Sequence, residues 1–492
     1  MRMSPRPANA RTFGLITGAM AAWAATLSGC AAGPNFHAPA PITDATYTAA
    51  PQPVSTAQTE GAGGAAQRFV PAESLGGAWW RTFGSADLDR LVEQALADSP
   101  TLAQARMKLE QAREDYRAQA GGSEWPQVNG SVDVTREKID PAAFGIGDLL
   151  GNRTFPPFTL YEAQVSVSYT LDLFGANRRA LEALAAGIDY QQYELDAARL
   201  TLAGNVVTSV IRRASLATQI DLSERMLAEQ LHELEITELR HRAGGISDSD
   251  LLSQRTQVEQ TRASVAPLRV QLAQADHQLA VYLGRTPAQG VAGVPALETL
   301  QLPTELPLTL PSTLARQRPD IRASEALLHQ ASANVGVATA NLFPQITLTG
   351  SFGPEGTELS HLVDVWSVGA GLTQPIFHGG QLQSRRRSAQ DAYQAAAAAY
   401  RQTVLQGLQQ VADALRALEQ DALQLAAREA VQGDAAASAR VAERRYSAGG
   451  LSQLSLLDTE RQELQATLDR TLVQAQRLAD TAALYQALGA GP

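Results

Sequence analysis

Residues 176–242 decide the fold of this chain, and they read ANRRALEALAAGIDYQQYELDAARLTLAGNVVTSVIRRASLATQIDLSERMLAEQLHELEITELRHR. The stretch contains no proline and only two glycines, and Ala, Leu, Gln, Glu and Arg fill most of it. Residues 381–448 have the same character. At a rise of about 1.5 Å per residue, each stretch would form a helix about 100 Å long, whereas a typical globular helix has roughly 11 to 12 residues. Two helices of this length indicate a coiled coil, a membrane span or a helical tube.

The overall charge of the chain is acidic. Its 492 residues carry a formal net charge of −10, and the Lys and Arg residues form no concentrated cluster. Proteins that bind nucleic acid usually present a basic patch or stripe. The charge pattern therefore gives no support for a nucleic-acid partner.

The N-terminus has the form of an export signal. Arg residues precede the apolar stretch Phe13–Leu27, and small residues follow it, which predicts a secretory signal peptide over residues 1–29. Leu27-Ser28-Gly29-Cys30 resembles the bacterial lipobox, whose cysteine is lipidated and becomes the first residue of the mature chain. Cys30 is the only cysteine, so disulfides within the chain are excluded. We expect acyl chains on Cys30 to tether the protein to a membrane; the alternative is an incidental buried thiol.

The segment after the signal peptide differs from the rest of the chain. Residues 30–84 are rich in Pro, Ala, Thr and Gly, and we predict that they form an extended segment leaving the lipid anchor. A helical pattern begins at about Ser85, is interrupted at Pro100 and continues to about Ala120. Gly121-Gly122 is predicted to end it.

Four segments alternate apolar and polar residues with the period of a β-strand. We predict strands near residues 126–135, 163–173, 344–353 and 366–376. Each has one apolar and one polar face, and its length is close to the about 9 to 11 residues with which a tilted strand crosses a bilayer. The alternative is a soluble sheet, whose apolar face would need a cover of helices.

The chain is an internal duplication. Short motifs of the first half recur in the same order in the second half. For example, Gly244-Gly245 corresponds to Gly449-Gly450. Such self-similarity indicates a repeated structural unit. We therefore predict two repeats, residues 85–310 and residues 311–492.

Each repeat pairs a long helix with a returning one. After the glycine turns, helical patterns run over residues 250–284 and 454–488. Ile220, Leu227 and Leu234 recur at the spacing of a coiled coil. Each half is therefore predicted to join a strand pair to a helical hairpin.

The strand number determines how many chains are needed. A sheet that spans lipid must close, and the smallest closed barrels have about 8 strands. One chain offers only the four predicted strands. Two chains would give about 8 strands and three about 12, and this count permits both.

The whole mature chain resembles the outer-membrane factor (TolC-like) family, in its lipoprotein branch that serves tripartite RND-type efflux systems. The resemblance implies a mainly α-helical, mixed membrane α+β fold, in which three chains form a 12-stranded transmembrane barrel continuous with a periplasmic coiled-coil barrel. The implied partners are two further copies in a homotrimer, a periplasmic adaptor protein, an inner-membrane RND-type pump and outer-membrane lipid. The matching motifs are the lipobox with Cys30, Gly33-Pro34-Asn35-Phe36, Trp79-Trp80 with Phe83, Leu171-Asp172-Leu173-Phe174-Gly175, Gln317-Arg318-Pro319-Asp320-Ile321 and Arg445-Tyr446-Ser447-Ala448-Gly449.

The resemblance also implies a periplasmic gate at the tips of the helical hairpins. It aligns Tyr446 with a gate tyrosine and Asp458 with an aspartate that threefold symmetry makes into a ring. Such a ring would attract cations. Leu451 and Ser455 stand where the family has a gate arginine and a second aspartate, so a gate salt bridge through those positions is in doubt.

The other tip offers further gate candidates. Asp248 and Asp250 follow the first glycine turn and would lie near the axis in the same way. The turns themselves are predicted at Gly244, Gly245, Gly449 and Gly450. The alternative for each aspartate is a solvated side chain at a helix start, where the helix dipole favours it.

Motifs of catalysis and metal binding are missing from the sequence. The seven histidines are scattered and form no His-Glu-x-x-His pair, and there is no phosphate loop and no Gly-x-Ser-x-Gly elbow. We therefore expect no enzyme activity, no bound metal and no cofactor.

The predicted function is a passive duct in the outer membrane that exports small molecules such as drugs and solutes. One alternative is an outer-membrane duct for polypeptides in type I secretion. Another is a lipid-anchored envelope tether without a pore.

Overall fold

The computed structural model describes residues 31–40, 42–72, 76–138 and 156–491. The predicted signal peptide and Cys30 lie outside the described residues. The chain forms two compact units. We call them the sheet unit, made of Met1–Ala38, Glu110–Asp189 and Glu325–Ala398, and the helical unit, made of Pro39–Leu109, Tyr190–Ser324 and Ala399–Pro492. Each unit contains segments of both sequence repeats.

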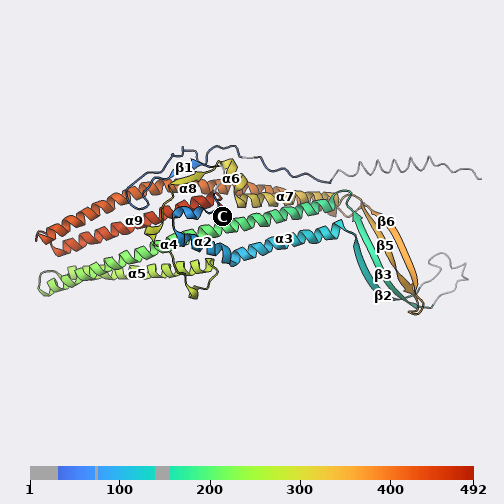
Figure 1. Ribbon diagram of the computed structural model, residues 1–492, viewed down its shortest axis with the longest axis horizontal. Helices are drawn as coiled ribbons and strands as arrows, with labels where there is room; N and C mark the ends of the chain where they lie inside the picture. Colours follow the sequence, from blue (N-terminus) through green and yellow to red (C-terminus); the bar gives the residue numbers. More distant parts are fainter. Residues whose placement is uncertain (1–30, 41, 73–75, 139–155, 492) are drawn as a thin grey trace, which may run out of the picture. The chain divides into compact units, whose positions relative to one another are not determined.

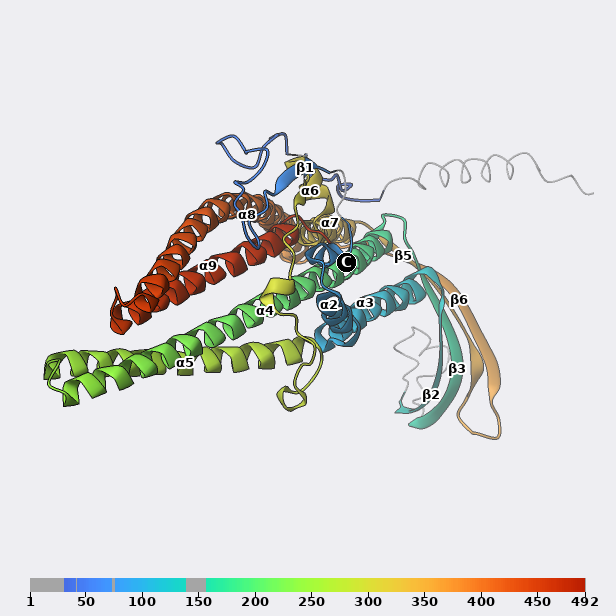
Figure 2. The ribbon, with the colours of Figure 1, turned by 60° about the vertical axis from the view of Figure 1, so that its left-hand side comes forward.

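The sheet unit contains one four-stranded antiparallel sheet in the order β2-β3-β5-β6. Its strands are β2 Gln127–Glu137, β3 Phe158–Leu171, β5 Gln345–Gly356 and β6 Val363–Thr373. They appear as one curved ribbon in Figures 1 and 2. β2–β3 and β5–β6 are the two predicted strand pairs, and the pairing of β3 with β5 joins the two repeats.

The β3–β5 pairing depends on a glycine. A Cβ atom built on Gly353 would lie 2.0 Å from the carbonyl oxygen of Ala163 on β3 and 2.6 Å from the Cα atom of Gln164. These contacts are with backbone atoms, which cannot move aside as a flexible side chain can. Only glycine therefore lets the two repeats approach this closely.

The helix that precedes the sheet is longer than predicted. α3 spans Pro100–Glu124 and runs through Gly121-Gly122, so the prediction that it ends at these glycines is wrong. The side-chain amide of Gln127 donates to the carbonyl oxygens of both glycines, at 3.3 and 3.2 Å. These bonds satisfy carbonyl groups in the last turn that have no partner within the helix, and the helix continues for about one more turn, to Glu124.

The long helices are α4 Ala176–Arg242 and α8 Gln381–Ser447, each of 67 residues. In the helical unit, α4 forms a hairpin with α5 Asp248–Tyr282, and α8 forms one with α9 Gln453–Ala487 (Figures 1 and 2). Ion pairs cross both hairpins, for example Arg213–Asp276 and Arg428–Asp469, each at 3.0 Å. Among the described helices, none is both long enough and apolar enough to cross a membrane.

The remaining described elements complete the helical unit. A strap, residues 48–71, ends in β1 Arg68–Pro71, which pairs in parallel with β4 Glu305–Leu308. The other elements are η1 Trp79–Phe83, α2 Ala86–Asp98, η3 Pro287–Gln289, η4 Leu297–Thr299, α6 Pro311–Gln317 and the start of α7 Pro319–Ala340, which belongs to the sheet unit from Glu325 onward.

The 3-10 helix η1 departs from the extended conformation predicted for residues 30–84. Trp79, Trp80 and Phe83 are all buried there. The Trp79 ring stacks on Tyr485 of α9 with centroids 5.2 Å apart. In a 3-10 helix residues three apart share a side, as Trp80 and Phe83 do, and the burial of the rings stabilises the turn.

Candidate functional site

The register of the sheet separates apolar from polar residues. Val132 on β2 lies opposite Ala163 on β3, and the adjacent pair is Ser131 with Gln164. The same alternation continues across the other two pairings, for example Phe352 with Trp366 and Ser351 with Ser367. Because successive side chains point to opposite faces, the sheet has one apolar face and one polar face.

The apolar face is exposed to the surroundings of the chain. Val132 is 80% exposed, Trp366 71% and Val368 82%. Hydroxyl groups pair on the other face, where Thr170 meets Thr347 and Ser351 meets Ser367. Large exposed apolar patches mark interaction sites with protein or membrane. A soluble sheet would require helices that cover its apolar face. Within the described residues, no helix covers this one.

The sheet leads into α4 through a capped turn. The Asp172 carboxylate accepts from the backbone N–H groups of Asn177 and Arg178, at 3.2 and 2.9 Å. Gly175, between them, has φ +79°, a conformation that favours glycine. The matching motif Leu171-Asp172-Leu173-Phe174-Gly175 is therefore the junction of strand and helix.

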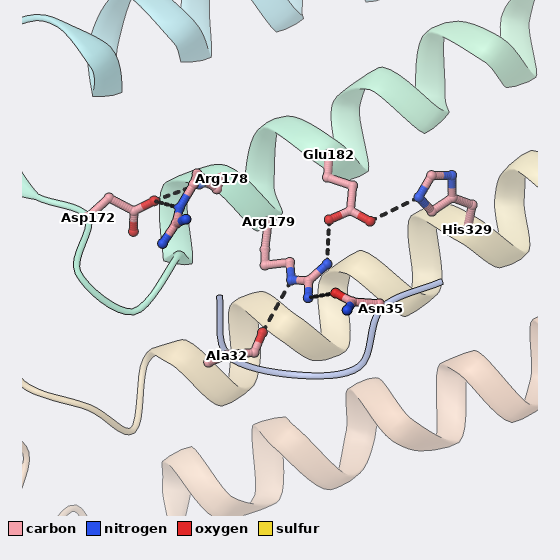
Figure 3. Close-up of polar contacts among 7 residues, drawn as sticks. All are labelled: Ala32, Asn35, Asp172, Arg178, Arg179, Glu182 and His329. Atoms are coloured by element: carbon pink, nitrogen blue, oxygen red, sulfur yellow. Dashed lines mark hydrogen bonds and ion pairs between the residues drawn. The ribbon is translucent and has the colours of Figure 1, made fainter. Parts of the chain in front are cut away.

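The chain directly after Cys30 is bound at this junction (Figure 3). We call residues 31–36 the anchor arm. The Ala32 N–H donates to the carbonyl oxygen of Phe174 at 2.8 Å. Arg179 of α4 donates to the Ala32 carbonyl oxygen at 3.2 Å and to Asn35 Oδ1 at 2.7 Å. Since Arg179 is only 4% exposed, it binds the arm from a buried position.

A second set of contacts completes the anchor. Arg179 also donates to Glu182 at 2.6 Å, and the other carboxylate oxygen of Glu182 lies 2.9 Å from His329 Nε2 (Figure 3). The His329 ring stacks on Phe36 of the arm, with centroids 4.4 Å apart. Burial alone would raise the pKa of Glu182, but the hydrogen bonds and charges of Arg179 and His329 outweigh it and lower this pKa. Glu182 therefore stays ionised and orients both neighbours.

The two hairpin tips have the same backbone geometry. Gly244 and Gly449 both have φ +74°. In the first tip Gly245 N–H donates to the Arg240 carbonyl oxygen at 2.9 Å, and in the second Gly450 N–H donates to the Arg445 carbonyl oxygen at 2.8 Å. Such turns satisfy the last carbonyl groups of a helix with a residue in the left-handed region. The four predicted glycine positions lie in these turns.

The aspartates of the first tip hold the turn together. The Ser247 side chain and the Asp250 carboxylate form a capping box at the start of α5, with contacts of 2.8 to 3.2 Å. Asp248 Oδ1 lies 2.6 Å from His241 Nε2 on α4. Both aspartates, predicted as gate candidates, thus have partners within their own tip.

We expect Asp250→Ala to loosen the first tip. Losing one half of a capping box costs about 1 kcal/mol, which corresponds to roughly fivefold faster opening of the first turn of α5. Amide hydrogen exchange of that turn measures it. Ser455→Ala, at the equivalent place in the second tip, is the control and should change exchange in α5 less than about 1.5-fold. Unchanged exchange in Asp250→Ala would contradict the capping role.

The second tip has no carboxylate in the equivalent position. Ser452 caps α9 with a 3.2 Å bond from the Ser455 N–H, and the two hydroxyl groups lie 2.9 Å apart. Ser455 therefore takes the place that Asp250 has in the first tip. Tyr446 is 39% exposed near the end of α8.

Asp458 lies on α9 with its carboxylate half exposed. Arg461 pairs with it at 2.5 Å and Gln462 donates to it at 3.0 Å. Burial and then the charge of Asp458 raise the pKa of Glu233 on α4, against the hydrogen bond of Gln254 and the charge of Arg461. Asp458 thus lies within electrostatic range of Glu233. Within the described residues, no polar contact joins it to Tyr446, so the structure does not bring these two gate candidates together.

Sequence reasoning identified the tips but not the buried polar contacts. Arg179, Glu182 and His329 were not predicted, although they hold the arm next to the predicted lipidation site. Asn35 and Phe36 could have indicated that the arm is bound, because they place an amide and an aromatic ring in a segment of small residues. Arg179 is 144 residues from Asn35, and so local periodicity cannot pair them.

Metal-binding geometry is not found in the described part of the chain, where no three His, Cys, Asp or Glu side chains gather as ligands would. The candidate site therefore consists of groups that shape a surface and hold segments in place. Its features are a two-faced sheet, an anchored arm and two helical tips.

Known proteins share this arrangement over most of the chain. The profile of the family "Outer membrane efflux protein" matches residues 91–285 and 310–490. The pyoverdine export outer membrane protein OpmQ of Pseudomonas putida is 30% identical over 84% of this chain and 88% of its own length. Outer membrane protein OprJ of Pseudomonas aeruginosa is 30% identical over 95% of this chain and 94% of its own.

A solved structure agrees. The open state of the MtrE outer membrane channel of Neisseria gonorrhoeae superposes with a TM-score of 0.76 at 27% identity, covering 94% of this chain and 98% of that one. The predicted family, the mainly helical fold with four strands and the outer-membrane location are confirmed. The chain belongs to the outer membrane efflux protein family and is an outer-membrane efflux channel.

Proposed function

We propose that three copies of this chain form a closed duct through the outer membrane. The observation that carries the proposal is the exposed apolar face of a sheet whose outer strands, β2 and β6, each pair on one side only within the described residues. An unpaired strand edge is not stable in lipid. Closure with other copies satisfies both edges, and three copies supply the 12 strands that the family resemblance implies.

The long helices would form the periplasmic part of the same duct. α4 and α8 run without a break for 67 residues each, or about 100 Å. The partners would be a periplasmic adaptor protein and an inner-membrane RND-type pump, which supplies the energy. Lipidation at Cys30 would place the anchor arm at the membrane.

The tips would control access to the duct. We assign the selective role to Asp458, because its carboxylate is half exposed and symmetry would place three copies around the axis. Tyr446, Asp248 and Asp250 would support the gate, the last two by holding the first tip in shape. A ring of carboxylates favours cations over anions.

The cargo is proposed to be small molecules such as drugs and solutes. OpmQ is named for the export of pyoverdine. A duct for polypeptides and a tether without a pore are the alternatives.

Conductance in planar bilayers tests the proposal. We expect the purified chain to give stable ion-conducting steps, and Asp458→Ala to lower the ratio of cation to anion permeability several-fold. Glu298→Ala, which removes an exposed carboxylate of η4 outside the tips, is the control and should leave this ratio unchanged. A lack of any conductance in the native chain and in Asp458→Ala would contradict the duct and favour a tether.

A further inference from the structure

A cavity of about 830 Å³ lies in the helical unit, and none of the described residues that line it belongs to the sheet, the anchor arm or the tips. Its wall comes from the chain before and within the strap, from the connection between β4 and α6, and from α8. Pockets that hold small molecules have volumes of about 300 to 1,000 Å³ and are mostly apolar, with a few polar groups. The volume of this cavity therefore suits a small ligand.

One part of the cavity wall is apolar. It contains Phe69 of β1, Leu308 of β4 and Leu415 of α8, of which Phe69 and Leu415 are buried. Leu310, which also lines the cavity, is exposed, so the cavity opens to the surface beside it. An apolar ligand body that enters here leaves water and gains contact with these side chains.

Hydrogen bonds fix the wall of the cavity in the free chain. The Tyr47 hydroxyl donates to the carbonyl oxygen of Thr309 at 2.8 Å, and the Ala72 N–H donates to that of Leu308 at 3.1 Å. These bonds join the N-terminal side of the wall to the connection that follows β4. The cavity is therefore preformed, which lowers the entropic cost of binding a ligand.

One face of α6 supplies polar groups to the cavity. Thr313 and Arg316 are three residues apart, which places them on the same side of the helix, and both line the cavity. Within the described residues, neither side chain has a hydrogen bond or an ion pair to another residue. Arg316 is exposed, and it is the only charged residue among the described residues of the wall. The cavity therefore carries a single positive charge, which favours an anion.

Gln52 of the strap adds a polar group that lacks a partner. It lines the cavity, and within the described residues both its side-chain nitrogen and its side-chain oxygen are buried without a hydrogen bond. A buried amide that lacks its hydrogen bonds destabilises the fold. The wall therefore favours a ligand with a polar head over a purely apolar one.

We propose that this cavity binds a small amphipathic carboxylate, which has one negative charge on an acyl or aromatic body. The carboxylate pairs with Arg316 and accepts a hydrogen bond from the Thr313 hydroxyl, while the apolar body contacts Phe69 and Leu415. The Gln52 amide turns toward the ligand and donates to it. Because the wall includes both the strap and α6, the bound carboxylate stabilises the attachment of the strap.

Equilibrium dialysis of the full chain in lipid nanodiscs, with empty nanodiscs as the blank, tests the proposal. The probes are cinnamate and octanoate, and their uncharged amides are the comparison. At neutral pH we expect saturable binding of both carboxylates, about fivefold tighter than binding of the amides, as for a partly exposed ion pair. Tighter binding of octanoate would identify a lipid-derived acyl chain as the ligand, and tighter binding of cinnamate an aromatic solute. A lack of saturable binding of both carboxylates, or equal affinity for carboxylate and amide, would overturn the proposal.

Arg316→Met separates the effect of charge from that of shape, because it keeps the length of the side chain. Its affinity for cinnamate should fall about fivefold, and its affinity for cinnamamide should not change. Arg212→Met is the matched control, since Arg212 of α4 is exposed and does not line the cavity. It should keep the native preference for the anion. The same preference in Arg316→Met would overturn the proposal.

Gln52→Leu tests the unpaired amide. An unsatisfied buried amide can be replaced by an apolar side chain of similar shape with little loss of stability or with a gain, so the unfolding temperature should not fall. The lost hydrogen bond to the ligand should weaken cinnamate binding about tenfold. Native affinity for cinnamate in this variant would overturn the proposal.

Amide hydrogen exchange measures the effect of the ligand on the strap. The Ala72 N–H, directly after the strap, is bonded to Leu308 in the cavity wall. Cinnamate at about ten times its dissociation constant should slow exchange of this N–H about tenfold, because the wall opens only when the ligand has left. The same concentration should slow it only about threefold in Arg316→Met. Unchanged exchange of Ala72 in the native chain with saturating cinnamate would overturn the proposal.

Discussion

Val132→Arg is expected to abolish insertion of the sheet into the outer membrane, whereas Ser131→Arg is expected to allow it. The two residues are neighbours in the middle of β2 and point to opposite faces. A charged side chain that faces the bilayer midplane costs about 2 to 4 kcal/mol, and every copy in the assembly carries it. On the polar face the same side chain is solvated.

The measurement is the amount of heat-modifiable oligomer in the outer-membrane fraction. We expect little or none for Val132→Arg and close to the native amount for Ser131→Arg. Because both variants place Arg in the same strand, a loss of strand propensity cannot explain a difference between them. Equal insertion of the two variants would contradict the assignment of the faces.

Arg179→Met should release the anchor arm from the junction of sheet and helix. The substitution keeps an apolar stem of similar length but removes the donors to Ala32, Asn35 and Glu182. Hydrogen bonds from a charged group are worth about 1.5 to 3 kcal/mol. Asn35 is exposed, so water replaces part of what its bond to Arg179 contributes. We therefore expect the docked arm to lose about 3 kcal/mol of stability in total, the upper value for one such bond. This corresponds to a change on the order of a hundredfold in the equilibrium between the docked and the released arm.

Chymotrypsin cleavage after Phe36 measures this equilibrium, because the Phe36 ring stacks on His329 in the docked arm. Cleavage follows the population of the open form when reclosing is fast. Arg178→Met removes the adjacent arginine, which is half exposed and lies 3.5 Å from Asp172, and should change the rate less than about threefold. A native rate in Arg179→Met would mean that the arm is held by other contacts.

The tips illustrate what part of the site the sequence could supply. Gly244 and Gly449 stand out as glycines between helical patterns, and the structure gives both the same positive φ. Asp250 was recognisable as an acid near a helix start, but the sequence left open whether it is a gate residue or a solvated side chain favoured by the helix dipole. The capping box with Ser247 required atomic positions, since both roles place an acid at the same point of the chain.

The end of α3 shows where local rules failed. Gly121-Gly122 indicated a helix end, because glycine is unfavourable within helices. The amide of Gln127, which lies beyond the helix, donates to both glycine carbonyl groups. This contact follows from the position of β2, and so a local pattern could not reveal it.

The sequence by itself determined the long helices, the two-faced strands, the duplication and the family resemblance. These features depend on periodicity and on motifs within short stretches, where each residue's neighbours are known in advance. The tertiary structure alone decided the pairing of β3 with β5, the binding of the anchor arm by Arg179 and the hydrogen bonds from Arg477 to the carbonyl oxygens of Gly63 and Ala65 in the strap. Such contacts join residues far apart in the chain, and only the folded backbone determines which buried charge meets which partner.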